Sequence, residues 1–296
     1  MIAIQAYGFT NFGKQSTAVH QDSIAKTTMD KAKAIFLGVD IPKTITKKYP
    51  RIPYERVNIP FKENDNINAW ILRTDSISKG MVVIFHGFLE EKSSKLYYGY
   101  NIMNMGYDIV LVDFLGAGES SGYQSTIGYN EAENVKAVYD YLSENNYTDN
   151  MYLLGFSMGA VAIIKAQHDY NMDVNGLILE APYGTLEGTI GARLDLVGAP
   201  RTIFEQLITF WVGRVNDFDG FALRPQDYAK DIKVPVLLMV GEHDQYVSLD
   251  EIQLIHDNLA TDNKILSIMS KSKHENYLRK NTREWRIQVR RFLKSN

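Results

Sequence analysis

The feature that most constrains the fold of this chain is a set of four short runs that are almost wholly apolar. These runs are MVVIF from position 81, DIVLV from 108, MYLLG from 151 and VLLMV from 236. A strand that is apolar on both faces is buried on both faces, which is typical of a parallel sheet covered by helices. Helical patterns supply the covering layers, and they span 92–105, 130–145, 158–170, 249–259 and 282–294.

The complete hydrophobic pattern predicts eight strands. They span 54–59, 67–73, 81–85, 108–112, 151–155, 176–180, 236–240 and 264–269. The first two have no helix between them, which indicates an antiparallel start, and the later strands alternate with helices. We therefore predict an α/β fold with a mostly parallel eight-stranded sheet flanked by helices.

One interval is too long for an ordinary crossover. About fifty residues separate the strand that ends at Glu180 from the strand that follows Pro235, whereas most connections are far shorter. Two apolar helical patterns, 185–197 and 201–213, lie in this interval and predict a helical lid inserted after the sixth strand; an ordinary crossover with an extra helix is the alternative. The expected organisation has three parts. They are an N-terminal extension at 1–53 with a short helix at 27–37, a core in two pieces at 54–182 and 231–296, and the lid at 183–230.

Composition and charge exclude several functions. The 296 residues include 32 Lys and Arg against 35 Asp and Glu, and a chain of net charge −3 is not expected to bind nucleic acid. The absence of cysteine excludes a thiol nucleophile and a cysteine-ligated metal. No H-E-x-x-H spacing indicates a catalytic metal, and we expect neither metal nor cofactor.

The sequence also gives expectations about location. No stretch of eighteen apolar residues occurs, and the start of the chain lacks the features of a signal peptide. The cytoplasm is the default expectation. A bacterial cell envelope, with membrane association, is expected only if an N-terminal anchor has been removed. The sequence leaves the oligomeric state open.

The clearest chemical motif is GFSMG at 155–159, which lies between an apolar strand and a helix rich in small residues. This strand–turn–helix setting is the one in which G-x-S-x-G presents a serine nucleophile. The turn is tight, so Gly155 and Gly159 are needed where a side chain would clash. We therefore predict that the turn holds Ser157 in a strained conformation, as a nucleophile whose Oγ projects over the sheet edge, with a purely structural serine as the alternative.

A serine hydroxyl needs a base, and the base needs an orienting acid. His274 follows the last strand in a polar loop, and such loops open at the same carboxyl edge of a parallel sheet as the Ser157 turn. His243 is its competitor. Asp244 follows the strand at 236–240 and is the predicted acid, with Glu242 as the alternative.

Acyl transfer also needs donors for the developing oxyanion. The backbone N–H of Met158, directly after the nucleophile, is one predicted donor, and the N–H of Phe88 in the loop after the third strand is the other. Gly87 allows a close approach of that loop. His86 is predicted to support the loop by hydrogen bonding and not to act as a base.

Five motifs occur in the order HGF at 86–88, DFLGAGES at 113–120, GFSMG at 155–159, GEHDQYV at 241–247 and KHEN at 273–276. Together they resemble the α/β-hydrolase superfamily, in its serine aminopeptidase and lysophospholipase-like branch, over about residues 54–295. The order Ser, Asp, His is that of α/β-hydrolases. Leu115 stands where this family's loop usually has Arg, which puts the local packing in doubt. Members include esterases, acylglycerol lipases, thioesterases and peptidases, so the resemblance leaves the substrate open.

The predicted function is that of a serine hydrolase that forms an acyl-enzyme with a small-molecule carboxylic ester, thioester or lipid ester. The lid would supply an apolar pocket, for which the candidates are Tyr183, Phe204, Ile208 and Trp211.

Three alternatives stay open. One is a non-catalytic binding protein of the same fold. A serine peptidase is another, with Glu187 and Asp195 as acidic anchors by location alone. The third is a dinucleotide enzyme, but the glycines at 116–122 read G-x-G-x-x-x-G and the next helix begins too late to hold a phosphate.

Overall fold

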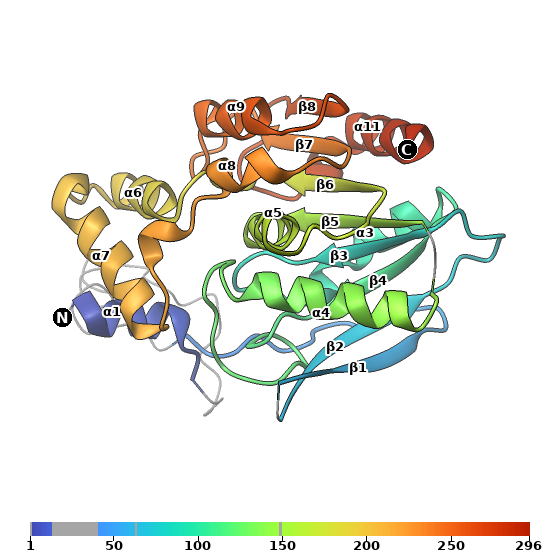
Figure 1. Ribbon diagram of the computed structural model, residues 1–296, viewed down its shortest axis with the longest axis horizontal. Helices are drawn as coiled ribbons and strands as arrows, with labels where there is room; N and C mark the ends of the chain where they lie inside the picture. The colour runs from blue at the N-terminus through green and yellow to red at the C-terminus, as the bar shows by residue number, and fades with distance from the viewer. Residues whose placement is uncertain (1, 14–40, 63, 148–149) are drawn as a thin grey trace.

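The computed structural model describes residues 2–13, 41–62, 64–147 and 150–296. Its centre is one eight-stranded sheet (Figure 1). The strands are β1 (Glu55–Phe61), β2 (Asp65–Leu72), β3 (Met81–Phe85), β4 (Asp108–Val112), β5 (Met151–Phe156), β6 (Gly176–Glu180), β7 (Val236–Gly241) and β8 (Lys264–Met269). Their order across the sheet is β1-β2-β4-β3-β5-β6-β7-β8. β1 and β2 pair antiparallel, as do β2 and β4, and every later pair is parallel, which confirms the predicted sheet.

Helices cover both faces of this sheet (Figure 1). The helical segments are α1 (Ile2–Thr10), η2 (Lys92–Lys95), α3 (Leu96–Met103), α4 (Glu131–Glu144), α5 (Met158–Tyr170), α6 (Leu186–Val197), α7 (Arg201–Val215), η3 (Gly220–Ala222), α8 (Pro225–Tyr228), η4 (Ala229–Asp231), α9 (Leu249–Asn258), α10 (Tyr277–Lys280) and α11 (Thr282–Ser295). No helix of the described ranges is both long and apolar enough to cross a membrane.

The apolar strands divide their side chains between two cores. On β3, Val83 and Phe85 enter the core that also contains apolar residues of α4, α5 and α9, whereas Val82 and Ile84 enter the core formed with α3 and α11. Successive side chains of a strand point to opposite faces, so an unbroken apolar run serves two covered faces. The four runs in the sequence therefore have the physical cause that was expected of them.

The segment between β6 and β7 contains α6, α7 and three short helices, so the long interval in the sequence is helical. Figure 1 shows α6 and α7 beyond the carboxyl ends of the central strands, with α1 beside α7. We call residues 183–230 the helical insertion; these limits, and its role as a lid, stay predictions.

Two helical features were not expected from the sequence. The helix α1 packs on α7, and Asn216 donates a hydrogen bond of 2.9 Å to the Thr10 hydroxyl between them. It lacks the capping and charge signals that mark a helix start, and Gly8 interrupts its pattern. The predicted helix at 27–37 lies outside the described residues. The predicted helix at 92–105 begins as the 3-10 turn η2 because the carboxylate of Glu91 accepts the amide of Ser93.

Candidate active site

A strained turn between β5 and α5 presents Ser157. Its φ of 51° and ψ of −115° lie outside the usual regions for a residue with a side chain, and its amide donates to the Glu180 carbonyl at 2.7 Å. A Cβ at Gly155 would lie 2.5 Å from the amide nitrogen of Ala160, and one at Gly159 would lie 2.6 Å from the Phe85 carbonyl. Both glycines are thus required by backbone contacts on either side of the serine.

A chain of hydrogen bonds joins three side chains from three loops. The His274 Nε2 lies 3.0 Å from the Ser157 Oγ, and its Nδ1 lies 2.8 Å from Oδ2 of Asp244. The side chain of Asp244 is fully buried, and its Oδ1 accepts the amides of Tyr246 and Val247 at 2.9 and 3.1 Å. With the Asp244 carboxylate facing Nδ1, that nitrogen is the donor of the ring and Nε2 is the acceptor of a hydrogen bond from the Ser157 hydroxyl.

The competing residues, His243 and Glu242, take no part in this series of hydrogen bonds. The His243 side chain is exposed and faces the neighbouring Glu242 carboxylate at 3.9 Å. Glu242 accepts the amide of Lys271 at 2.8 Å, so it fixes the turn after β8. The structure thus brings His274 and Asp244 to the serine, not their competitors.

Aromatic rings hold the imidazole from two sides. The centroids of the Phe156 and Tyr246 rings lie 5.0 and 5.3 Å from that of His274. Beneath them, the Tyr277 hydroxyl accepts the Gly241 amide at 2.8 Å and lies 3.4 Å from Oδ2 of Asp244. Burial raises the pKa of Tyr277, which keeps the hydroxyl protonated. Sequence reasoning missed these rings, although 156 and 246 lie inside the two motifs that carry the serine and the acid.

The two predicted oxyanion donors carry no hydrogen bond to any residue that the structure describes, so the amides of Phe88 and Met158 are free to bind a ligand. His86 supports the first of these loops. Its Nδ1 donates to the Gly87 carbonyl at 2.8 Å, and its Nε2 accepts the Phe114 amide at 3.2 Å. Burial lowers the pKa of His86, and this pairing requires the neutral ring.

A partly buried ion pair also supports the loop of Phe88. The Glu90 carboxylate accepts the Gly87 amide at 2.8 Å and meets the Lys95 Nζ at 2.7 Å. Burial acts to raise the pKa of Glu90, but Lys95 and the amide of Gly87 outweigh it and hold that pKa low. The Lys95 Nζ lies 4.5 Å from the Phe156 ring, so the same cation contacts the aromatic wall of the histidine. No motif in the sequence marked either residue.

The loop at 113–120 has a cation from elsewhere in the chain. The Nζ of Lys92 contacts Asp113 and lies 2.8 Å from Glu119, with its side chain fully buried. Leu115, where the family pattern has Arg, donates its amide to Asn134 at 3.0 Å. Lys92 thus supplies this loop with a positive charge that Leu115 does not carry.

The four predicted pocket residues differ in their surroundings. Tyr183 is buried and its hydroxyl donates to the Ile127 carbonyl. Ile208 and Trp211 are partly buried and pack against the main core, whereas Phe204 is exposed. Their role in a substrate pocket stays a prediction.

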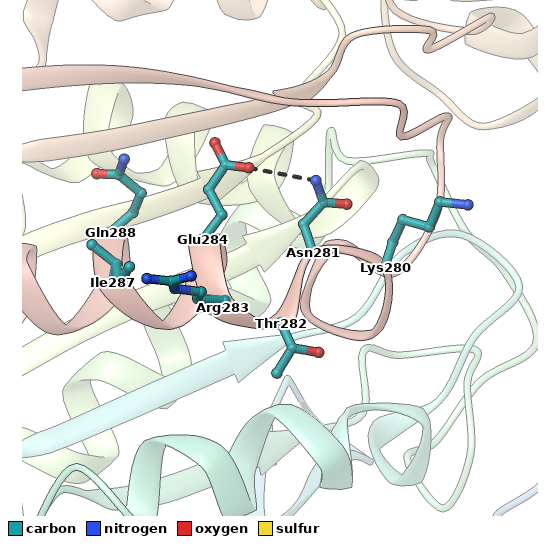
Figure 2. Close-up of a pocket in the computed structure, with 7 residues that line it drawn as sticks. All are labelled: Lys280, Asn281, Thr282, Arg283, Glu284, Ile287 and Gln288. Carbon is teal, nitrogen blue, oxygen red and sulfur yellow. Dashed lines mark hydrogen bonds between the residues drawn. The ribbon is translucent and has the colours of Figure 1, made fainter.

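A surface depression occurs elsewhere, along α10 and α11. Figure 2 shows the side chains that line it, among which Asn281 lies 3.4 Å from Glu284; the lining residues are Lys280, Asn281, Thr282, Arg283, Glu284, Ile287 and Gln288. None of the predicted site residues lines it. Within the described ranges, no group of three or more His, Cys, Asp or Glu side chains is arranged to hold a metal ion.

The strand order and the strained turn after β5 are those of the α/β-hydrolase fold. A family model described as "Serine aminopeptidase, S33" matches residues 76–207. The uncharacterized protein YqkD of Bacillus subtilis (strain 168) is 21% identical over 215 residues, which cover 72% of this chain and 70% of that protein.

Solved structures have the same fold. The Pyrococcus furiosus esterase Pf2001 superposes with a TM-score of 0.71 at 22% identity, covering 86% of this chain and 98% of its own. The esterase EaEST from Exiguobacterium antarcticum has a TM-score of 0.60 at 21% identity, covering 80% and 98%. At these identities the likeness confirms the fold.

Proposed function

We propose that this protein is a serine hydrolase that cleaves an ester-type substrate through an acyl-enzyme. The substrate is a carboxylic ester, as followed below, or alternatively a lipid ester or a thioester, which would release a thiol in place of the alcohol. The observation that carries the proposal is the hydrogen-bonded chain from Ser157 through His274 to Asp244 at a strained turn. The similarity to the esterases Pf2001 and EaEST supports an ester as the substrate.

In the first step, the Oγ of Ser157 attacks the carbonyl carbon of the ester while Nε2 of His274 takes the hydroxyl proton. Asp244 stabilises the imidazolium and keeps its orientation. The amides of Phe88 and Met158 donate to the oxyanion of the tetrahedral intermediate. The intermediate then breaks its bond to the leaving oxygen, which receives the proton from His274 and departs as an alcohol.

In the second step, water attacks the acyl carbon and gives a proton to Nε2 of His274. A second tetrahedral intermediate uses the same two amides. Its collapse breaks the bond to Ser157, whose Oγ recovers the proton from His274, and the carboxylic acid leaves. The fixed position of His274 between Asp244 and Ser157 allows one imidazole to serve both steps.

A serine peptidase of the same fold has less support. An aminopeptidase needs an anion near the site for the free amino terminus, but Asp195 on α6 is exposed and pairs with Arg201 at 3.2 Å. Among the described residues, Glu187 makes no contact with Ser157, His274 or Asp244 that would support it as that anchor. A non-catalytic protein would leave the Ser157–His274 contact without a use.

The test combines covalent labelling with turnover. The protein should react with a fluorophosphonate probe and hydrolyse 4-nitrophenyl butyrate. Ser157→Ala should abolish labelling and lower kcat by about ten thousand-fold or more. Ser76→Ala, at an exposed serine, is the control and should keep both. Labelling or wild-type turnover in Ser157→Ala would contradict the proposal, and an unreactive wild-type serine would favour a binding protein.

A further inference from the structure

A cation of the helical insertion contacts a ring that flanks the catalytic histidine. The guanidinium carbon of Arg193, on α6, is 4.8 Å from the centroid of the Tyr246 ring. That ring meets His274 nearly edge-on, at 5.3 Å between centroids and an interplanar angle of 78°. One aromatic ring therefore separates the guanidinium from the imidazole that contacts Ser157.

The other arginines of the helical insertion have carboxylate partners, and Arg193 differs from them. Arg201 pairs with Glu205 at 2.5 Å, and Arg224 pairs with Asp227 at 2.5 Å. Arg193 forms no ion pair with any residue in the described part of the chain. Its Nη1 donates to the carbonyl and hydroxyl of Thr189 on its own helix.

The bonds to Thr189 leave most of the guanidinium donors available. Arginine has five N–H donors in a planar fork, and only Nη1 makes a hydrogen bond among the described residues. Asp244 acts on Arg193 electrostatically, but its oxygens already accept the amides of Tyr246 and Val247 and the proton of His274. The free N–H donors of Arg193 can therefore bind an anion that comes from outside the protein.

The guanidinium of Arg193 is open to solvent and also lies within the influence of protein groups. Burial among neighbouring protein atoms lowers its pKa, whereas Tyr183, Tyr246 and Asp244 act to raise it. Because the side chain is exposed, an anion from solution can reach it.

We infer that Arg193 binds a carboxylate of the substrate, so that the preferred substrates are esters that carry a negative charge a short distance from the scissile bond. This inference rests on the proposed ester hydrolysis. A planar guanidinium with free donors matches a carboxylate in bidentate geometry. The same charge opposes a protonated amino terminus, so it separates these substrates from those of an aminopeptidase.

Two matched substrate pairs test the inference and locate the charge. Mono-4-nitrophenyl succinate against 4-nitrophenyl butyrate places the carboxylate in the acyl part. The pair of 4-acetoxybenzoate and phenyl acetate places it in the leaving group. The quantity compared is kcat/KM for the charged substrate divided by kcat/KM for the neutral one. In one of the two pairs, Arg193→Gln should lower this ratio by about tenfold or more. The kcat/KM of the neutral substrate should change little. Arg193→Glu should lower the ratio further, and Arg193→Lys should retain part of it.

Arg214→Gln is the matched control, because it removes the same charge from an exposed position near the end of α7. It should leave both ratios unchanged. Calorimetric titration with glutarate gives a readout that needs no turnover: the wild type should bind it, and Arg193→Gln should bind it at least about tenfold more weakly. Circular dichroism shows whether the variant is folded.

The outcomes separate this inference from the proposed function. If Arg193→Gln changes neither substrate ratio nor glutarate binding, the inference is wrong, even where Ser157→Ala abolishes turnover. A wild type that prefers the neutral member of both pairs and binds no glutarate overturns it as well. If the wild type hydrolyses no ester and resists the fluorophosphonate, the proposed function fails, while loss of glutarate binding in Arg193→Gln would still establish an anion site.

Discussion

The carboxyl edge of the sheet and the helical insertion beside it are built in opposite ways. At the edge, the side chain of Asp244 is fully buried and each of its carboxylate oxygens has a partner. The Glu90 carboxylate fixes the neighbouring loop by accepting the Gly87 amide. On the insertion, large apolar side chains of α6 and α7 are open to solvent: Leu196, Val197, Ile203, Phe204, Leu207 and Phe210. Hydrogen bonds thus fix the edge, whereas the insertion presents apolar surface to solvent.

Under the proposed function, this difference suits the two regions to different tasks. Acyl transfer needs reacting groups held within hydrogen-bond distance, which buried and saturated polar networks provide. Selection among substrates needs exposed apolar and charged groups beyond the reacting atoms. The following variants therefore should affect chemistry at the edge, stability beneath it and substrate preference on the insertion.

The largest effect in this comparison is expected for Asp244→Asn. The amide would favour the wrong tautomer of His274, because its NH₂ cannot accept the Nδ1 proton, and kcat should fall by roughly ten thousand-fold. Glu242→Gln, two residues earlier and bonded to the Lys271 amide, should change kcat by less than about tenfold. Steady-state hydrolysis of 4-nitrophenyl butyrate measures both, and equal losses in the two variants would show that the acid is wrongly assigned.

A second prediction concerns a buried acid directly behind the nucleophile. The side chain of Glu180 is fully buried at the end of β6, where it accepts the Trp285 indole N–H at 2.5 Å and the Tyr98 hydroxyl at 2.8 Å. Burial raises its pKa from 4.5 to about 7, against the effect of these donors. The folded protein then binds this proton more tightly than the unfolded chain does.

The contribution of Glu180 to stability is therefore fully present below about pH 4.5 and is lost as the pH rises through about 7. Its size is about 3 kcal/mol of unfolding free energy. Urea denaturation at pH 5 and pH 8 should show this loss in the wild type and not in Glu180→Gln. The control Glu187→Gln removes a carboxylate from α6 and should keep the wild-type pH dependence. Parallel curves for wild type and Glu180→Gln would contradict the prediction.

The smallest effect on stability is expected on the insertion. Phe204→Ala removes a ring that is 40% exposed and lies outside the core, so the free energy of unfolding should change by less than about 1 kcal/mol. If the ring contributes to the acyl pocket, kcat/KM should fall several-fold for 4-nitrophenyl octanoate and stay constant for the acetate. Ile77→Ala, at an exposed apolar residue before β3, is the control and should alter neither. An unchanged octanoate-to-acetate ratio in Phe204→Ala would remove this residue from the pocket.

The sequence predicted the sheet well because its signals are local. Each apolar run extends over a few residues, and burial on both faces decides its composition wherever it lies in the chain. The signal for the turn at Ser157 is equally local. Gly155 and Gly159 are required by backbone contacts within one strand–turn–helix unit and its neighbouring strand. The helix α1 was missed because its packing partner, α7, lies about 200 residues further along the chain.

The sequence by itself determined the eight strands, the strained serine and the candidates for base and acid. Only the tertiary structure decided which candidates meet. His274 reaches Ser157 across 117 residues because parallel strands bring their carboxyl ends to one edge. The same packing sets Lys92 against Asp113, and it places Arg193 over the ring that flanks the histidine. These contacts have no local pattern, since they join elements that become neighbours through the sheet and its helical layers.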